Sequence, residues 1–256
     1  MDRCDDHDDK KKNGIKTFIF GKKYWFNINY LSNQLNEFDS TYFADFVKFF
    51  FSSTQSLIPC QHCRKSVKGH LKKPEYDICI WMDTRTLPQF SYFLHNAVNS
   101  ALGVKPEDSQ IMMNYENVSE EKYEEMFWGW IIYLAFNFPA DINFTDYWNG
   151  ISTSPFGSYT QNSKEGVELT KRLKAYVTFF DLIKNFLPRD SKLLDNWIQA
   201  YTNRTPTLIT FSSKTKLLAW VFEMARECHM KFDTAPKTTD SLISFLNQLH
   251  PTRSAV

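Results

Sequence analysis

Two cysteines one helical turn apart, Cys60 and Cys63, have the clearest capacity for chemistry in this chain. Pro59 precedes them and the following residues favour a helix over 60–71, so the first thiol falls at a helix N-terminus. Free N–H groups and the helix dipole stabilise a thiolate there. A second thiol one turn later lets the pair close a disulfide and exchange it with an outside dithiol. The pair therefore predicts redox exchange, although C-x-x-C alone is an unspecific pattern.

Three other interpretations of the pair stay open at this point. A zinc site would use His62 or His70, but structural zinc wants a second ligand pair, and Cys79 has no neighbour of that kind. We therefore expect no metal. A thioredoxin-type isomerase would place the pair after a β-strand, whereas the flanking residues favour helices. The two cysteines could also be incidental.

A second polar group lies in one predicted helix, residues 89–102. His95 and Asn99 are four residues apart and share a face, with Asn96 close by. Apolar neighbours favour burial of this helix, and a buried imidazole or amide needs hydrogen-bond partners. A planar ligand with many acceptors would supply them, and the alternative is a solvated polar face.

Helices must position both groups. In the first half of the chain, apolar residues at helical spacing predict helices over residues 18–33, 40–52, 60–71 and 89–102. Gly103, with Pro106 beyond it, ends the last of these. In the second half the same reasoning, with a polar loop over 149–163, predicts helices over residues 119–138, 165–187, 191–202, 214–232 and 239–249.

We therefore expect an all-α protein with two domains. Residues 1–14 are charged and aperiodic and are predicted to be a disordered tail. Residues 15–118 hold the cysteine pair and the polar helix in a four-helix bundle. Residues 119–256 form a second helical domain that has no redox motif.

Composition favours the same class. Aromatic residues make up 16% of the chain while only 8 residues are Gly, which suits packed helices better than a turn-rich sandwich. A net charge of +1 indicates neither nucleic acid nor an anionic membrane as partner. Five cysteines do not make a secreted disulfide scaffold. The N-terminus lacks the apolar stretch of a secretory signal, so we expect a soluble, cytoplasmic protein.

Four segments, in order, resemble the Erv/ALR family of FAD-dependent sulfhydryl oxidases. Residues 21–29 (GKKYWFNIN) are similar to the family's Gly-Arg-x-x-Trp-x-x-Leu-His helix. Residues 59–63 match its Pro-Cys-x-x-Cys, and residues 95–103 carry its His-Asn-x-Val-Asn-x-x-Leu-Gly signature intact. Lys105 and Tyr115 stand for the basic and aromatic residues that hold the adenosine part. The Asn-, Phe- and Tyr-rich composition is similar to that of proteins from AT-rich large DNA viruses, several of which carry short Erv-like oxidases.

The resemblance implies FAD in the mouth of the bundle. Cys60 would exchange with a substrate thiol and Cys63 would face the flavin, with electrons passing to O2 to give H2O2. The implied partners are thiol-containing proteins and O2, with a possible homodimer. The residues implied to hold the cofactor are Gly21, Lys22, Trp25, Asn29, His95, Asn96, Val98, Asn99, Lys105 and Tyr115.

The chain also departs from the family pattern. Lys22 replaces the usual arginine and loses its bidentate fork, and Asn29 replaces the usual histidine. Phe90 stands where many members have Trp, and Lys105 falls one residue late. The structural C-x16-C pair is absent, with only Cys79 in that region. An alternative function is therefore an Erv-like binding or scaffold protein that has lost flavin chemistry.

The second half has two interpretations. Residues 128–139 (WGWIIYLAFNFP) are similar to a first Erv helix, and the Pro-to-aromatic spacing over 188–220 is close to that over 59–90, which suggests a degenerate, flavin-free copy. Such spacings also arise by chance among amphipathic helices. An unrelated helical domain for substrate choice or dimer contact is the alternative.

The remaining cysteines are isolated. Cys4 would be an idle thiol or a shuttle, since it lies in the predicted tail. Cys79 and Cys228 are expected to be buried or idle, because Cys228 lies within an apolar predicted helix.

Overall fold

The computed structural model is all-helical over the residues it describes. These are 17–34, 49–50, 56–58, 61–76, 87–101, 103–106, 118–138, 164–188, 191–206, 210 and 213–228. They contain seven α-helices and no β-strand, which confirms the predicted all-α class for this part of the chain. The predicted tail 1–14, most of the helix 40–52, the loop 149–163 and the helix 239–249 lie outside the described residues.

The first half contributes three α-helices close to the predicted bounds. They are α2 (Thr17–Gln34), α4 (Gln61–His70) and α5 (Leu87–Ala101), and a 3-10 turn, η3 (Pro74–Tyr76), follows α4. Their observed ends lie within two residues of the predicted ones. Helix α5 begins earlier than predicted and includes Pro88, because proline is tolerated in a first turn, where its missing N–H has no helical partner.

The end of α5 is set by a glycine, as predicted. Gly103 has φ 70°, a left-handed conformation that glycine adopts without steric cost. Its N–H donates to Ser100 O at 3.1 Å, and Val104 N–H donates to Asn99 O at 2.8 Å. These two bonds form a Schellman motif, which satisfies carbonyls that the helix end leaves open.

The second half contributes four α-helices. They are α7 (Glu120–Phe136), α9 (Lys164–Leu182), α10 (Lys192–Asn203) and α11 (Lys214–Glu227), and α9 continues as the 3-10 turn η5 (Ile183–Asn185). Helices α7, α10 and α11 each begin after a serine N-cap whose hydroxyl accepts the backbone N–H three residues on; these are Ser119, Ser191 and Ser213.

Three helices in this half end before their predicted ends. The helix predicted over 119–138 ends at Phe136, because Asn137 caps it with its N–H on the carbonyls of the preceding turn. In the helix predicted over 165–187, the α-helix ends at Leu182 and continues as a 3-10 turn, which is common at helix termini. The helix predicted over 214–232 ends at Glu227, with Cys228 as its C-cap.

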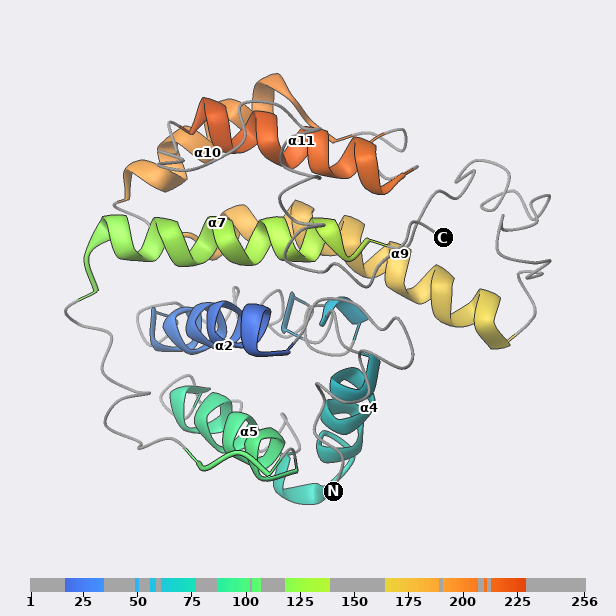
Figure 1. Cartoon of the computed structure of the whole chain (residues 1–256). Coiled ribbons are helices and arrows are strands. Elements are labelled where there is room, and N and C mark those ends of the chain that lie inside the picture. The colour runs from blue at the N-terminus through green and yellow to red at the C-terminus, as the bar shows by residue number, and fades with distance from the viewer. Residues whose placement is uncertain are drawn as a thin grey trace.

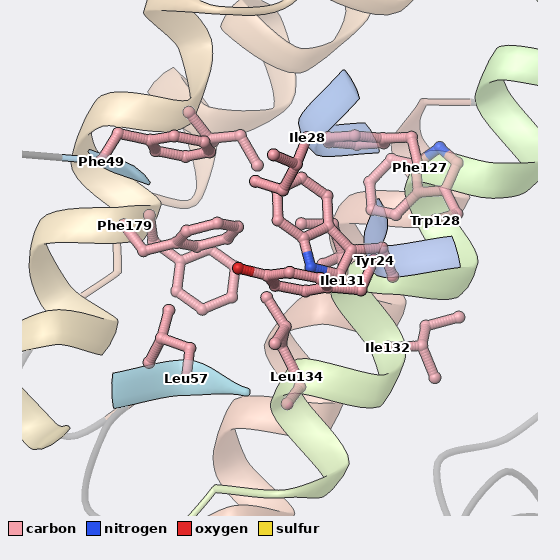
Figure 2. Packing of buried hydrophobic residues seen from close by; sticks show 14 of the residues in the cluster. Tyr24, Ile28, Phe49, Leu57, Phe127, Trp128, Ile131, Ile132, Leu134 and Phe179 are labelled. Atoms are coloured by element: carbon pink, nitrogen blue, oxygen red, sulfur yellow. The ribbon is translucent and has the colours of Figure 1, made fainter. Parts of the chain in front are cut away.

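The helices are stacked in tiers around a shared core. Figure 1 shows α10 and α11 at one end, then α7 with α9, then α2, and finally α5 with α4. Helix α2 packs on both α5 and α7, α7 packs on α11, and α4 packs on α5. Figure 2 shows side chains from α2, α7 and α9 meeting in one apolar cluster. The cluster is continuous across residue 119, and the division into two domains there stays a prediction.

Candidate functional site

A buried polar stripe runs along α5. Ser91, His95 and Asn99 follow one another at intervals of four residues and therefore lie on one helical face. Their exposed fractions are 0%, 6% and 8%. Val98 beside them is buried and Asn96 is half-buried. The polar face predicted from His95 and Asn99 is thus in the interior and is not a solvated surface.

A matching stripe on α2 faces it. Trp25 and Asn29 are also four residues apart, and both are buried. The indole of Trp25 stacks on the His95 ring, with 4.3 Å between centroids and 13° between planes. One turn further on, the Ser91 hydroxyl donates to Asn29 Oδ1. We call Trp25, Asn29, Ser91, His95 and Asn99 together the α2–α5 seam.

The pairing of α2 with α5 along the seam shows where the other predicted residues lie. Because Trp25 meets His95 and Asn29 meets Ser91, the two helices run antiparallel. One turn beyond, Asn99 therefore falls at the level of residues 21–22. Gly21 there is half-buried, while Lys22 and Lys105 are exposed. The two predicted lysines thus lie in solvent, where they can meet an anionic ligand without being buried.

The cysteine helix lies against the helix that carries the polar stripe. Cys63 is 3% exposed and Val67, four residues on, is fully buried, so both belong to the inward face of α4. Helix α4 packs on α5. The inner cysteine and the His95 stripe therefore lie on neighbouring helices. Cys60 and Tyr115 lie outside the described residues.

His95 is neutral at physiological pH. Its burial lowers the pKa of the imidazole to about 4, because desolvation disfavours the charged form. A neutral imidazole has one N–H donor and one acceptor nitrogen. His95 can therefore stack and hydrogen-bond with an uncharged ring system, without placing a positive charge in the seam.

Ser91 is a residue of the seam that the sequence analysis missed. It could have been found, since it precedes His95 by four residues and so continues the same stripe. Asn27, which lies between the two α2 residues of the seam, faces the other way. Its Nδ2 donates to Met126 O of α7 at 3.0 Å. It joins α2 to the second half of the chain.

Cys228 is buried, as expected. It is 3% exposed, and burial raises the pKa of its thiol to about 12, with Glu124 and Glu227 adding to the rise. A thiol with so high a pKa carries almost no thiolate at neutral pH and is inert. Cys4 and Cys79 lie outside the described residues.

Within the described part of the chain, no three His, Cys, Asp or Glu residues come close enough to hold a metal ion. The rival zinc site centres on Cys60 and His62, whose side chains are not among those described, and it stays an alternative.

None of the described helices combines the length and hydropathy needed to span a bilayer. No protein-family model, curated protein or solved structure matches this chain.

Proposed function

We propose that the chain is an FAD-linked sulfhydryl oxidase of the Erv/ALR type. The observation that carries the proposal is the stacking of Trp25 on His95 at 4.3 Å, on a helix that also packs against the cysteine helix α4. Three segments far apart in the sequence, each similar to one part of the family pattern, therefore meet around α5. Chance similarities in three segments would not be expected to converge in space.

The side chains of the seam fit a planar, hydrogen-bonding cofactor. An indole and a neutral imidazole offer flat aromatic surface, and carboxamides offer both donors and acceptors. The ring system would be held by Trp25, His95, Asn96 and Asn99. Exposed lysines attract phosphate groups as point charges. The remaining residues proposed for the cofactor are Gly21, Lys22, Asn29, Val98, Lys105 and Tyr115.

The chain's own chemistry is thiol–disulfide exchange. A substrate thiolate attacks Cys60 Sγ of the Cys60–Cys63 disulfide, and Cys63 leaves as a thiolate. A second substrate thiol then displaces Cys60, so the substrate departs as a disulfide and both cysteines are reduced. Bound FAD would supply the two-electron oxidation of this dithiol and the transfer of those electrons to O2, which would give H2O2.

The placement of α4 supports this division of roles. The helix begins at Gln61, directly after Cys60, so its free N–H groups and positive dipole end favour thiolate there. Cys63 is buried one turn inward, where it is screened from bulk solvent. The outer sulfur would therefore meet substrate while the inner one would stay inside the protein.

A binding or scaffold protein that has lost flavin is the second candidate. Asn29 favours it, because this residue stands where the family has histidine and its side-chain oxygen is occupied by the Ser91 hydroxyl. Lys22 also favours it, since an exposed lysine lacks the bidentate grip of arginine. Bound flavin in the purified protein distinguishes the two candidates.

The finer architecture and setting belong to the same proposal. We propose a four-helix Erv-type bundle over residues 15–118, with the predicted helix 40–52 as its fourth member. Residues 49–50 are helical, and Phe50 packs on Phe90 of α5 at 5.6 Å between ring centroids. A cytoplasmic location, thiol-containing protein substrates, a homodimer and a degenerate C-terminal copy are further parts of this proposal.

Two cysteine substitutions test the function. Cys63→Ser removes the inner thiol and should reduce oxidation of dithiothreitol, followed by oxygen consumption, by at least about a hundredfold. Cys228→Ser makes the same exchange at an equally buried cysteine outside the proposed site and should keep the wild-type rate per folded molecule. Full oxidase activity of Cys63→Ser would show that the proposal is wrong.

A further inference from the structure

The short segment that leads into the cysteine pair is buried against the second half of the chain. Leu57 and Ile58, which precede Pro59, are almost fully buried. Slightly upstream, Phe49 stacks on Phe179 of α9 with ring centroids 4.8 Å apart. Leu57 and Phe179 lie in the same apolar cluster in Figure 2. The segment before the cysteine pair is thus packed on α9, a helix that has no redox motif of its own.

Two guanidinium groups hold the backbone of this segment. Arg172 of α9 donates from Nε to Ser56 O and from Nη2 to Asn137 O, both at 3.3 Å. Arg64 of α4 donates from Nη1 to Ile58 O at 2.5 Å. Arg172 therefore ties the segment to the end of α7, while Arg64 ties it to the start of the cysteine helix.

The two arginines lie in one region. Burial raises the pKa of Tyr176 to about 12, and the positive charges of Arg172 and Arg64 both oppose that rise, so both guanidinium groups lie near this phenol. Tyr176 itself donates its hydroxyl to Leu134 O of α7 at 2.7 Å. Helices α4, α7 and α9 and the residues before Pro59 are thus joined at one polar junction.

Arginine suits this task better than lysine. Its planar fork can donate to two carbonyls at once and keeps its charge at any physiological pH, whereas lysine is a single point donor. Buried carbonyls that lose their donors cost stability and leave the backbone less constrained. A fixed positive charge near a helix N-terminus also favours a thiolate there.

We propose that Arg172 is a positioning residue for the cysteine pair, through which α9 fixes the segment 56–58 and, with Arg64, the placement and cationic surroundings of the first thiol. This inference rests on the proposed oxidase function and assigns the second half of the chain a role in it. Arg172 acts through the backbone that Cys60 continues.

The test uses the full-length protein and two measurements. The first is the turnover number for dithiothreitol oxidation, with flavin content per protein recorded. The second is the rate at which iodoacetamide alkylates Cys60 in the reduced protein across a pH series, read by peptide mass spectrometry. The second measurement does not require flavin, so it is informative even if the oxidase activity is absent.

Arg172→Gln should lower the turnover number roughly tenfold at unchanged flavin content, since small misplacements of reacting groups are costly. It should also raise the midpoint of the alkylation profile by about half a pH unit or more, because a cationic influence on the thiol is lost. Arg172→Lys keeps the positive charge, so it should show the wild-type alkylation midpoint but the lowered turnover number. If the glutamine variant does not fold, the lysine variant is used for the test.

Arg204→Gln is the matched control. Arg204 is a partly exposed arginine that joins α10 to α11 through Glu223 and Glu227, so its loss also weakens a helix contact. It should leave both measurements at their wild-type values. If Arg172→Gln behaves like Arg204→Gln while the wild type is an active oxidase, the positioning role is wrong. If the wild type is colourless and inactive, the proposed function fails instead.

Discussion

The two faces of α2 are equally buried but chemically unlike. Toward α5, the helix presents Trp25 and Asn29 to the polar stripe of His95 and Ser91. Toward α7 it presents Asn27, which donates to Met126 O, and mainly aromatic and aliphatic side chains, which take part in what we call the aromatic layer. The layer consists of Tyr24, Tyr123, Phe127, Trp128, Trp130, Trp197 and Trp220.

The two regions treat polar atoms in opposite ways. Among the described residues, the buried side-chain atoms without a hydrogen-bond partner include Nε1 of Trp128, Trp130 and Trp197 in the layer, and no atom of the seam. Each such atom costs about 1–3 kcal/mol, which the packing of large rings must offset. In the seam, polar side chains occupy positions where leucine or valine would suffice for stability. The aromatic layer therefore serves packing, whereas the buried polar side chains of the seam are typical of a binding site.

Matched tryptophan substitutions should separate the two regions most strongly. Trp197 is fully buried and its ring lies 5.6 Å from that of Trp128, so Trp197→Ala should lower the free energy of unfolding by about 3–5 kcal/mol. The molecules that remain folded should keep their flavin. Trp25→Ala should instead release flavin, because the aromatic surface stacked on His95 is lost. Urea unfolding and absorbance of the desalted protein measure the two effects, and flavin loss in both variants alike would remove the distinction.

Acid should destabilise the protein through the seam. The pKa of His95 is about 4 in the folded chain, below the ordinary value of 6.5. As the pH falls below about 6.5, the unfolded chain takes up a proton that the folded chain does not, and stability decreases until about pH 4. The difference corresponds to about 3 kcal/mol.

His95→Phe keeps a ring against Trp25 and removes this titration. Its free energy of unfolding should therefore depend less on pH than that of the wild type between about pH 7 and about pH 4.5. Urea unfolding at both pH values measures the change. Equal pH dependence in the two proteins would mean that His95 is not buried in its neutral form.

The smallest effects concern two helical glycines. A Cβ at Gly129 of α7 would lie 2.4 Å from Lys23 Cδ of α2, whereas a Cβ at Gly69 of α4 would meet nothing within 4 Å. Alanine favours a helix by about 0.5–1 kcal/mol over glycine. Gly69→Ala should therefore raise the melting temperature slightly. Gly129→Ala should gain less, since Lys23 must shift away from its ion pair with Glu125.

The displacement of Lys23 should offset only part of the gain at Gly129, because the crowded atoms belong to the flexible end of a lysine and its exposed ion pair contributes little. Thermal unfolding of both variants tests this. A destabilisation of more than about 2 kcal/mol in Gly129→Ala would indicate that the two helix backbones themselves are in contact there.

Local signals predicted the helices of the candidate site well. Pro59 before α4 and Gly103 after α5 act within a turn of the chain, so their effect can be read from neighbouring residues. The helical period likewise predicted that His95 and Asn99 share a face. The ends near residues 138, 187 and 232 were predicted too far along the chain, because no strong breaker lies at the observed ends and capping there depends on weak preferences.

Contacts between distant segments could not be read in this way. Nothing local to Ser91 indicates that its hydroxyl meets Asn29, and nothing local to Arg172 indicates that it meets Ser56. Such contacts depend on the packing of whole helices against one another, which the 3.6-residue period does not specify. Trp25, Asn29, His95 and Asn99 of the seam were predicted as residues, while Ser91, the register of the two helices and the contact between Arg172 and Ser56 came from the structure.

The most direct test of the central claim is the visible absorption spectrum of the purified full-length protein, supplied with FAD and desalted. We expect the bands of bound flavin, which should bleach when dithiothreitol is added without oxygen and return on aeration. In Cys63→Ser the bands should be present but should not bleach. A folded protein that stays colourless, or one whose flavin is reduced equally well without Cys63, would contradict the account.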